Sequence, residues 1–308
     1  MTPADRADSS VVPLTHIAPE DGARYPEQPL HHLDALWIQV AGTLCNLSCT
    51  HCFVSCGPGD LHHPLMSRVE VSARVAEALA LGVREFYFTG GEPFMHPEML
   101  AILEDTLEHG PCSVLTNGTL FTGQRLATLQ RLSDASRYAL ELRVSLDGWS
   151  AEQHDRFRGA GSFDRTLEGL RALERHGLLP ITTVTQNTDE DEQVFRERYL
   201  ARLRAAGLTR PRVKVLPMFL LGREKDRSRD YAAIETLRDL PAAAFDPTRL
   251  QCGGCRAVTA RGVYVCPLLV DEPDGRLGER LDQALAPYRL RHGACYTCYV
   301  TGMTCGNA

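Results

Sequence analysis

Three cysteines close to residue 50 have a spacing that suits metal chemistry. Cys45, Cys49 and Cys52 form the pattern C-x3-C-x2-C in a stretch that has neither helical nor strand periodicity. Three thiolates on one short loop can bind three irons of a [4Fe–4S] cubane and leave the fourth iron open for chemistry. On spacing alone the alternative is a zinc site, with His51 or Cys56 as its fourth ligand.

A second motif, Thr89-Gly90-Gly91-Glu92-Pro93, follows an expected strand. Paired glycines let a backbone approach a ligand closely, and the Glu92 carboxylate can accept hydrogen bonds from an ammonium group. Taken alone, the same residues would also serve as a plain turn between a strand and a helix. The ligand-binding interpretation therefore depends on whether the fold brings this motif to the first cysteines.

The C-terminal region holds a second group of cysteines, at positions 252, 255, 266, 295, 298 and 305. Two C-x2-C pairs about forty residues apart are compatible with a four-cysteine zinc ribbon as well as with an iron–sulfur cluster. Two fully ligated cubanes would need about eight thiolates, so this region can fully ligate only one.

Two cysteines lie outside these patterns. Cys112 opens an expected strand, and we expect it to be a small buried apolar side chain. Cys56 follows the first motif by four residues. We expect a local structural role for it, with donation of a hydrogen atom to a substrate as the alternative.

The composition narrows the compartment and the partners. The chain has 308 residues and a formal net charge of −6, so it has no global attraction to phosphate backbones, and we expect no nucleic acid partner. No stretch approaches the roughly 18 apolar residues of a membrane span, and the polar first residues lack the apolar segment of a signal peptide. Eleven cysteines, an odd number, fit metal chemistry better than complete disulfide pairing. We therefore predict a cytoplasmic protein without membrane association.

The elements that must position these residues follow an alternating rhythm. From Leu36 onward, short β-favouring runs alternate with amphipathic ones, which predicts repeated β–α units and a parallel sheet. The expected strands span 36–40, 85–89, 112–116, 140–146, 181–185 and 213–216. The helix signals are the Ser67/Glu70 capping box, Pro97 before and Gly110 after one helix, and Ser162 before and Gly177 after another, whose shared face is Phe163, Leu167, Leu170 and Leu173.

Six such strands fall short of the eight in a closed barrel, so we expect an α/β fold built as a partial (β/α)6 TIM-like barrel. Loops that follow parallel strands gather at one face, which would bring the first cysteines and the Gly-Gly motif together. The rhythm lapses after about Gly222. We therefore divide the chain into an irregular N-terminal extension (1–35), the core (36–223) and a small cysteine-rich domain (224–308).

On these motifs the chain resembles the radical S-adenosylmethionine (SAM) superfamily. The resemblance implies that the first three cysteines hold a [4Fe–4S] cluster, that its electron splits SAM, and that the resulting 5′-deoxyadenosyl radical abstracts a hydrogen atom from a substrate carbon. The residues that the resemblance implies for SAM binding are Thr89, Gly90, Gly91, Glu92, Asn117, Ser145 and Arg158.

Further stretches extend the resemblance along the chain. Ser145-Leu146-Asp147-Gly148, followed by His154-Asp155 and Arg158-Gly159, is similar to the S-L-D-G…H-D-x-x-R-G signature of the subgroup with cysteine-rich C-terminal extensions. In that subgroup the serine and the arginine contact the carboxylate or ribose of SAM. Without the resemblance, Arg158 would be an ordinary surface cation near a helix start. The stretches 116–119 and 217–223 also resemble strand ends of the family.

The C-terminal cysteines resemble the twitch or SPASM extensions, which bind auxiliary iron–sulfur clusters. The full SPASM pattern has seven cysteines, and this chain has six and lacks a closing step. The resemblance implies one auxiliary [4Fe–4S] cluster, with zinc as the alternative. Its simplest ligand set is Cys255, Cys266, Cys295 and Cys298, with Cys252 as a replacement for Cys255 and with Cys305 spare.

An auxiliary cluster in this family often takes up an electron from the substrate. The resemblance therefore implies a net oxidation or a cross-link, in peptide modification or in small-molecule biosynthesis, with a low-potential flavodoxin or ferredoxin as electron donor. Two other functions remain open on the residues alone. One is a non-catalytic iron–sulfur electron carrier, and the other is a zinc-organised binding protein.

Overall fold

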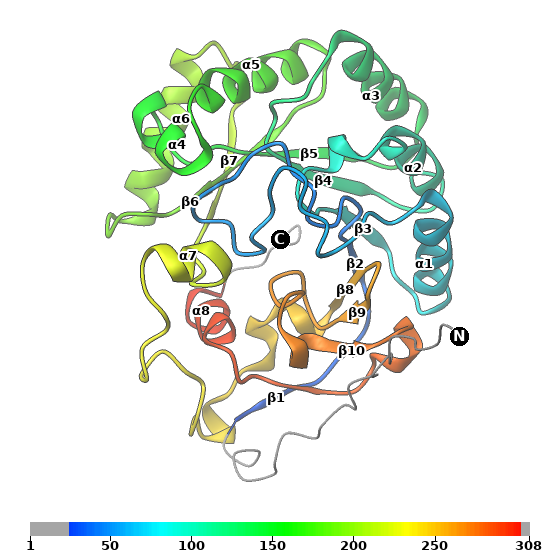
Figure 1. Cartoon of the computed structure of the whole chain (residues 1–308), viewed down its shortest axis with the longest axis vertical. Coiled ribbons are helices and arrows are strands. Elements are labelled where there is room, and N and C mark those ends of the chain that lie inside the picture. The colour runs from blue at the N-terminus through cyan, green and yellow to red at the C-terminus, as the bar shows by residue number, and fades with distance from the viewer. Residues whose placement is uncertain (1–24, 303–308) are drawn as a thin grey trace, which may run out of the picture.

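A nine-stranded sheet forms the centre of the computed structural model, which describes residues 25–302 (Figure 1). Six of its strands are parallel and follow one another in sequence order. They are β2 (Ala35–Ile38), β3 (Glu85–Phe88), β4 (Cys112–Thr116), β5 (Leu140–Ser145), β6 (Ile181–Thr185) and β7 (Arg212–Leu216). Each expected strand is present, with its ends shifted by no more than two residues.

Helices form an arc outside these strands (Figure 1). They are α1 (Arg68–Ala80), α2 (Met99–Thr106), α3 (Gly123–Ala135), α4 (Ala151–Arg158), α5 (Ser162–Arg175) and α6 (Glu192–Ala205). The Ser67/Glu70 capping box is present at the start of α1, and the predicted apolar face of α5 is buried. The second helix is shorter than the Pro97 and Gly110 signals predicted, because it ends at Thr106 and the chain continues as a turn.

The C-terminal region extends the same sheet. Its strand β8 (Cys255–Thr259) pairs in parallel with β2, and β9 (Gly262–Tyr264) and β10 (Arg276–Gly278) follow in antiparallel order. The region also contains α7 (Gly222–Arg227), β11 (Tyr288–Arg289), α8 (Gly293–Thr301) and the 3-10 turns Ala242–Ala244, Pro247–Arg249, Gln251–Gly253, Pro273–Gly275 and Leu281–Gln283. The sheet thus crosses the predicted boundary at residues 223 and 224, and the division into domains stays a prediction.

The described part of the N-terminal extension is held by the C-terminal region. Strand β1 (Glu27–Gln28) pairs antiparallel with β11, and the backbone N–H of His31 donates to the carbonyl of Gly253 at 2.9 Å. Residues 1–24, most of the predicted irregular extension, lie outside the described residues.

The sheet ends at β10 on one side and at β7 on the other. The fold is therefore the expected α/β class with a parallel central sheet, and the barrel is incomplete. Its main apolar core lies between the strands and the surrounding helices, where Phe86, Val114 and Leu170 are fully buried. Within residues 25–302 no helix is both long and apolar enough to cross a membrane.

Candidate functional site

The first three cysteines lie on the loop that follows β2, which Figure 1 shows in blue near the centre of the molecule. Cys45, Cys49 and Cys52 line one cavity of about 170 Å³. The ends of the neighbouring strands contribute most of the other walls. Among the residues predicted for SAM binding, those that line this cavity are Thr89, Gly90, Gly91, Asn117, Ser145 and Arg158.

Glu92 is the one residue predicted for SAM binding that does not line this cavity. It is fully buried, and its carboxylate accepts from Thr116 Oγ1 at 2.7 Å and from the backbone N–H of Asn117 at 2.8 Å. A third bond comes from the backbone N–H of Phe94 at 3.1 Å. Burial raises the pKa of Glu92, and these hydrogen bonds oppose that rise. The carboxylate therefore fastens its motif to the end of β4, and its contact with an amino group stays a prediction.

The paired glycines also have a packing role that we did not predict, and their approach to a ligand stays a prediction. A Cβ on Gly91 would lie 2.1 Å from the carbonyl oxygen of Leu44, and a Cβ on Gly90 would lie 2.9 Å from that of Gly42. Gly90 also has a φ of 131°, which favours glycine. The backbone N–H of Gly91 donates to Gly42 at 2.9 Å. The glycines therefore allow the cysteine loop itself to approach, whether or not a ligand does.

Asp147, at the end of β5, joins the cysteine loop to Arg158. Its Oδ2 atom accepts from Arg158 Nε at 2.6 Å and lies 2.8 Å from His51 Nε2, while Oδ1 accepts from the backbone N–H of Thr185 at 2.9 Å. Burial raises the pKa of Asp147, but the Arg158 and His51 charges and these hydrogen bonds hold it well below its usual range. We did not predict this link, although both its acidic residue and His51 stand inside the motifs that we singled out.

Gly222 and Arg223 hold the loop from the other side. The backbone N–H of Arg223 donates to the carbonyl of Cys52 at 3.0 Å, and its guanidinium donates to the carbonyl of Cys56. A Cβ on Gly222 would lie 2.7 Å from the Cys52 carbonyl oxygen, so only glycine fits there. The stretch 217–223 thus has a local reason for its sequence, because it packs on the cysteine loop.

The three thiols have different electrostatic surroundings. Burial raises the pKa of Cys45 to about 12 and also raises the pKa of Cys49. The Arg158 guanidinium, whose Nη1 lies 4.0 Å from Cys49 Sγ, opposes the rise at Cys49. A hydrogen bond from the Cys56 side chain lowers the pKa of Cys52. Thiolates so deeply placed need positive charge close by, which a bound metal supplies. Three sulfurs that line one cavity fit a cubane with three protein ligands and one free iron.

The two isolated cysteines differ in environment. Cys112 is buried in β4, as predicted, and burial raises its pKa. Cys56 is also buried, but it lines the first cavity, and its backbone N–H donates to Cys52 Sγ at 3.4 Å. The structure leaves both of its predicted roles open.

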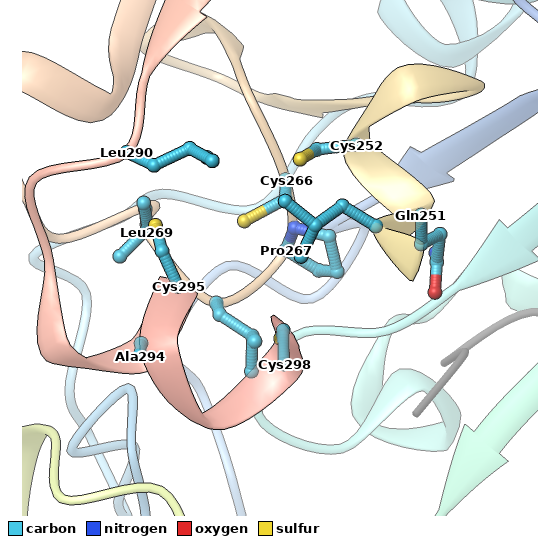
Figure 2. A pocket seen from close by; sticks show the side chains of 11 residues that line it. Gln251, Cys252, Cys266, Pro267, Leu269, Leu290, Ala294, Cys295 and Cys298 are labelled. Carbon is cyan, nitrogen blue, oxygen red and sulfur yellow. The ribbon is translucent and has the colours of Figure 1, made fainter. Parts of the chain in front are cut away.

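The C-terminal cysteines form a second site (Figure 2). Cys252, Cys266, Cys295 and Cys298 line one cavity of about 40 Å³, whose other walls are mainly leucines. Cys252 lies in the turn Gln251–Gly253, whereas Cys295 and Cys298 lie one helical turn apart on α8. Burial raises the pKa of Cys252 to about 12 and also raises those of Cys266 and Cys295. Four cysteines that line one cavity with mainly apolar walls suit a fully ligated metal centre.

Cys255 does not line this second cavity. It is the first residue of β8, where it is buried in the apolar cluster that contains Trp37 and Tyr87. The simplest ligand set that we predicted, which contains Cys255, therefore does not line the cavity. The alternative set, in which Cys252 replaces Cys255, does. The physical reason is that β8 begins at Cys255 and directs its side chain into the sheet core. Cys305 lies outside the described residues.

Comparison with known families gives one match for the core. A sequence profile of the radical SAM superfamily matches residues 40–197, about half of the chain. The chain is 35% identical over 169 residues to the AdoMet-dependent heme synthase of Methanosarcina barkeri. The aligned region covers 52% of this chain and 45% of the relative. It is 34% identical over 137 residues to the subtilosin biosynthesis protein AlbA of Bacillus subtilis, over 44% of this chain and 29% of that protein.

A longer but weaker similarity links the chain to the GTP 3′,8-cyclase of Rhodopseudomonas palustris, with 28% identity over 85% of this chain and 71% of the relative. The chain thus spans less than half of the length of the heme synthase and AlbA. Among solved structures, Streptococcus suis SuiB bound to its precursor peptide SuiA has a TM-score of 0.61 at 14% identity, over 85% of this chain and 65% of SuiB. The protein anSMEcpe with bound AdoMet has a TM-score of 0.59 at 16% identity, over 81% and 79%. These two structures share the fold.

Proposed function

The chain belongs to the radical SAM superfamily, and on that premise we propose that it cleaves SAM reductively in order to oxidise or cross-link a substrate. A [4Fe–4S] cluster and SAM together supply a 5′-deoxyadenosyl radical that takes a hydrogen atom from a substrate carbon. Two of the relatives named above, the heme synthase and the GTP 3′,8-cyclase, are enzymes, which supports a catalytic function.

One observation carries this proposal. The three motif cysteines and six of the seven residues predicted for SAM binding line the same cavity, although they come from separate parts of the chain. Cys45, Cys49 and Cys52 would hold the cluster. Ser145 and Arg158, which line the same cavity, would orient the carboxylate or ribose of SAM, and the Gly90–Gly91 backbone would face its amino group.

A second cluster forms part of the proposal. Cys252, Cys266, Cys295 and Cys298 would ligate one auxiliary [4Fe–4S] cluster, with residues 224–308 as its domain. A fully ligated cluster has no open iron, so this one would accept or pass on electrons rather than bind the substrate directly. Electron acceptance supports a net oxidation or a cross-link.

The substrate class that we propose is a peptide, with a small biosynthetic intermediate as the alternative. AlbA is named as a bacteriocin biosynthesis protein, and SuiB has been solved with a precursor peptide, which supports the first choice. A low-potential flavodoxin or ferredoxin would supply the electron that starts each turnover.

Anaerobically purified protein tests the proposal. We expect about eight irons and a similar amount of sulfide per chain, and formation of 5′-deoxyadenosine after reduction in the presence of SAM. A colourless protein that contains only zinc would overturn both clusters. Iron–sulfur clusters without formation of 5′-deoxyadenosine would instead identify an electron carrier. The matched control is the Cys112→Ala protein, because that cysteine lies outside both cavities and should leave iron and activity unchanged.

A further inference from the structure

Arg256 is a buried cation beside the second cysteine cavity. Its side chain lies on β8 and is 1% exposed, so its guanidinium is withdrawn from water. Nη1 donates to the carbonyl oxygens of Cys252 and Cys255 at 2.9 and 2.8 Å, and Nε donates to that of Ala284 at 2.7 Å. Nη2 donates to Ala286 at 3.4 Å. The guanidinium is thus fixed by four backbone carbonyls, one of which belongs to a proposed cluster ligand.

This charge has no carboxylate partner in the part of the chain that the structure describes. Within residues 25–302 Arg256 forms no ion pair with an aspartate or a glutamate. Carbonyl dipoles reduce the cost of burying a cation, but a full compensating charge normally comes from an anion. Burial lowers the pKa of Arg256, and the negative charge of ionised Cys255, Cys252 and Cys266 opposes this. Of the groups whose charge acts on Arg256, Cys252 and Cys266 line the second cavity, so a cluster held there would place negative charge close to the guanidinium.

The charge of Arg256 also acts on the ligands. The guanidinium donates to the carbonyl of Cys252, whose residue lines the cavity together with Cys266. A cubane held by four thiolates is a dianion when oxidised and gains a further negative charge on reduction. The leucine-rich walls of the cavity disfavour that added charge, and a fixed cation beside it favours the reduced form.

We propose that Arg256 is the counter-charge of the auxiliary cluster and raises its reduction potential, so that the cluster can accept an electron. This inference rests on the proposed auxiliary cluster. Arg256 acts on the reaction only through the cluster, whose negative charge it stabilises, and it does not contact the substrate. The couple exchanges one electron with the titrant or the substrate, and no bond forms or breaks at Arg256.

A redox titration of the auxiliary cluster, followed by electron paramagnetic resonance on the holoenzyme, tests this. SAM perturbs only the cluster with an open iron, so its addition distinguishes the two signals. In Arg256→Gln the reduced-to-oxidised ratio at a fixed potential should fall about tenfold, equivalent to about 59 mV for one electron. Arg256→Lys retains the charge and should stay within about threefold of the wild type. The first cluster is the internal reference and should not shift in either variant.

A second pair of variants leaves Arg256 intact, in case Arg256→Gln does not assemble its cluster. Ala286 is exposed, and its carbonyl accepts from Arg256, so Ala286→Asp places a carboxylate near the guanidinium. We expect Ala286→Asp to lower the ratio in the same direction, and the uncharged Ala286→Asn to leave it unchanged. Arg171→Gln, at a carbonyl-bonded arginine on α5, controls for loss of an arginine elsewhere.

The outcomes separate the two proposals. Wild-type protein with only about four irons would show that the auxiliary cluster itself is absent, and the proposed function would then lose that part. About eight irons together with unchanged ratios in Arg256→Gln and Ala286→Asp would overturn the role of Arg256 alone. An unchanged ratio in Ala286→Asp would overturn it equally if Arg256→Gln lacked its second cluster.

Discussion

The Oδ2 atom of Asp147 lies 2.8 Å from Nε2 of His51, a residue that stands between the second and third cysteines of the first motif. The same oxygen accepts from Arg158 at 2.6 Å. One buried carboxylate at the end of β5 therefore sets the position of the cysteine loop and of an arginine on the cavity wall. The two sequence motifs are parts of a single electrostatic unit.

Loss of this carboxylate charge should loosen the loop. Asp147→Asn leaves the largely buried Arg158 guanidinium, whose side chain is 13% exposed, without its counter-charge, which typically costs about 3–5 kcal/mol. We expect the thermal midpoint of the holoenzyme to fall by about 5–10 °C and the iron content to fall with it. Asp282→Asn removes an exposed carboxylate that pairs with Arg280 and should change neither quantity measurably. Equal midpoints for the two variants would contradict the proposed unit.

A buried histidine makes stability depend on pH. Burial, with the nearby Arg158 charge, lowers the pKa of His154 to about 4, whereas an unfolded histidine titrates near about 6.5. Between these values the unfolded chain binds a proton that the folded chain does not. Stability is therefore full above about pH 6.5 and falls by about 1.4 kcal/mol for each pH unit below it, down to about pH 4.

Thermal midpoints measured between pH 8 and pH 5.5 check this dependence. His154→Asn cannot titrate, and its side chain retains an acceptor for the backbone N–H of Asp147, which His154 Nδ1 now accepts at 3.1 Å. The variant should lose most of the decline seen in wild type, whereas replacement of the exposed His109 by Asn should retain it. An unchanged slope in His154→Asn would assign the decline to other groups.

The strands of the core could be predicted because each is a short run of buried apolar residues between turn signals, as in β3 and β4. Helix α4 could not, because its sequence is polar and His154 is its one buried residue. The parallel pairing of β8 with β2 joins Ala35 to Cys255. Nothing local to either strand specifies a partner so distant in the chain.

The site shows a similar limit. Cysteine spacing, strand-end placement and the family resemblance together predicted nine of the residues that line the first cavity: Cys45, Cys49, Cys52, Thr89, Gly90, Gly91, Asn117, Ser145 and Arg158. They could not show that the Glu92 carboxylate would be used by Thr116 and Asn117, because those donors lie more than twenty residues away in sequence. The spacing of a C-x2-C pair does not indicate which of its two cysteines binds a metal. Here the start of β8 distinguishes Cys255 from Cys252.

The close approach of the Gly-Gly turn to the cysteine loop predicts a selective defect. A Cβ on Gly91 would lie 2.1 Å from the Leu44 carbonyl oxygen and 2.9 Å from the Cys45 Cβ, so Gly91→Ala must displace the loop. We expect this variant to lose the first cluster, retain about four irons, and form at most about 1% of the wild-type 5′-deoxyadenosine. Gly123→Ala meets no atom within 4 Å and should behave as wild type. A fully loaded, active Gly91→Ala protein would contradict the packing.

The second cavity makes the two cysteines of one C-x2-C pair inequivalent. Cys252 faces the cavity with Cys266, Cys295 and Cys298, whereas Cys255 is buried in the apolar core of the sheet. Cys252→Ala removes a proposed ligand and should reduce the iron content from about eight to about four per chain, without change to the signal of the first cluster. Cys255→Ala removes a buried sulfur that accepts from Gln251 Nε2 at 3.6 Å, and it should retain about eight irons at a cost in stability of about 1 kcal/mol. The reverse pattern would restore Cys255 as the ligand and would require β8 to begin later than it does here.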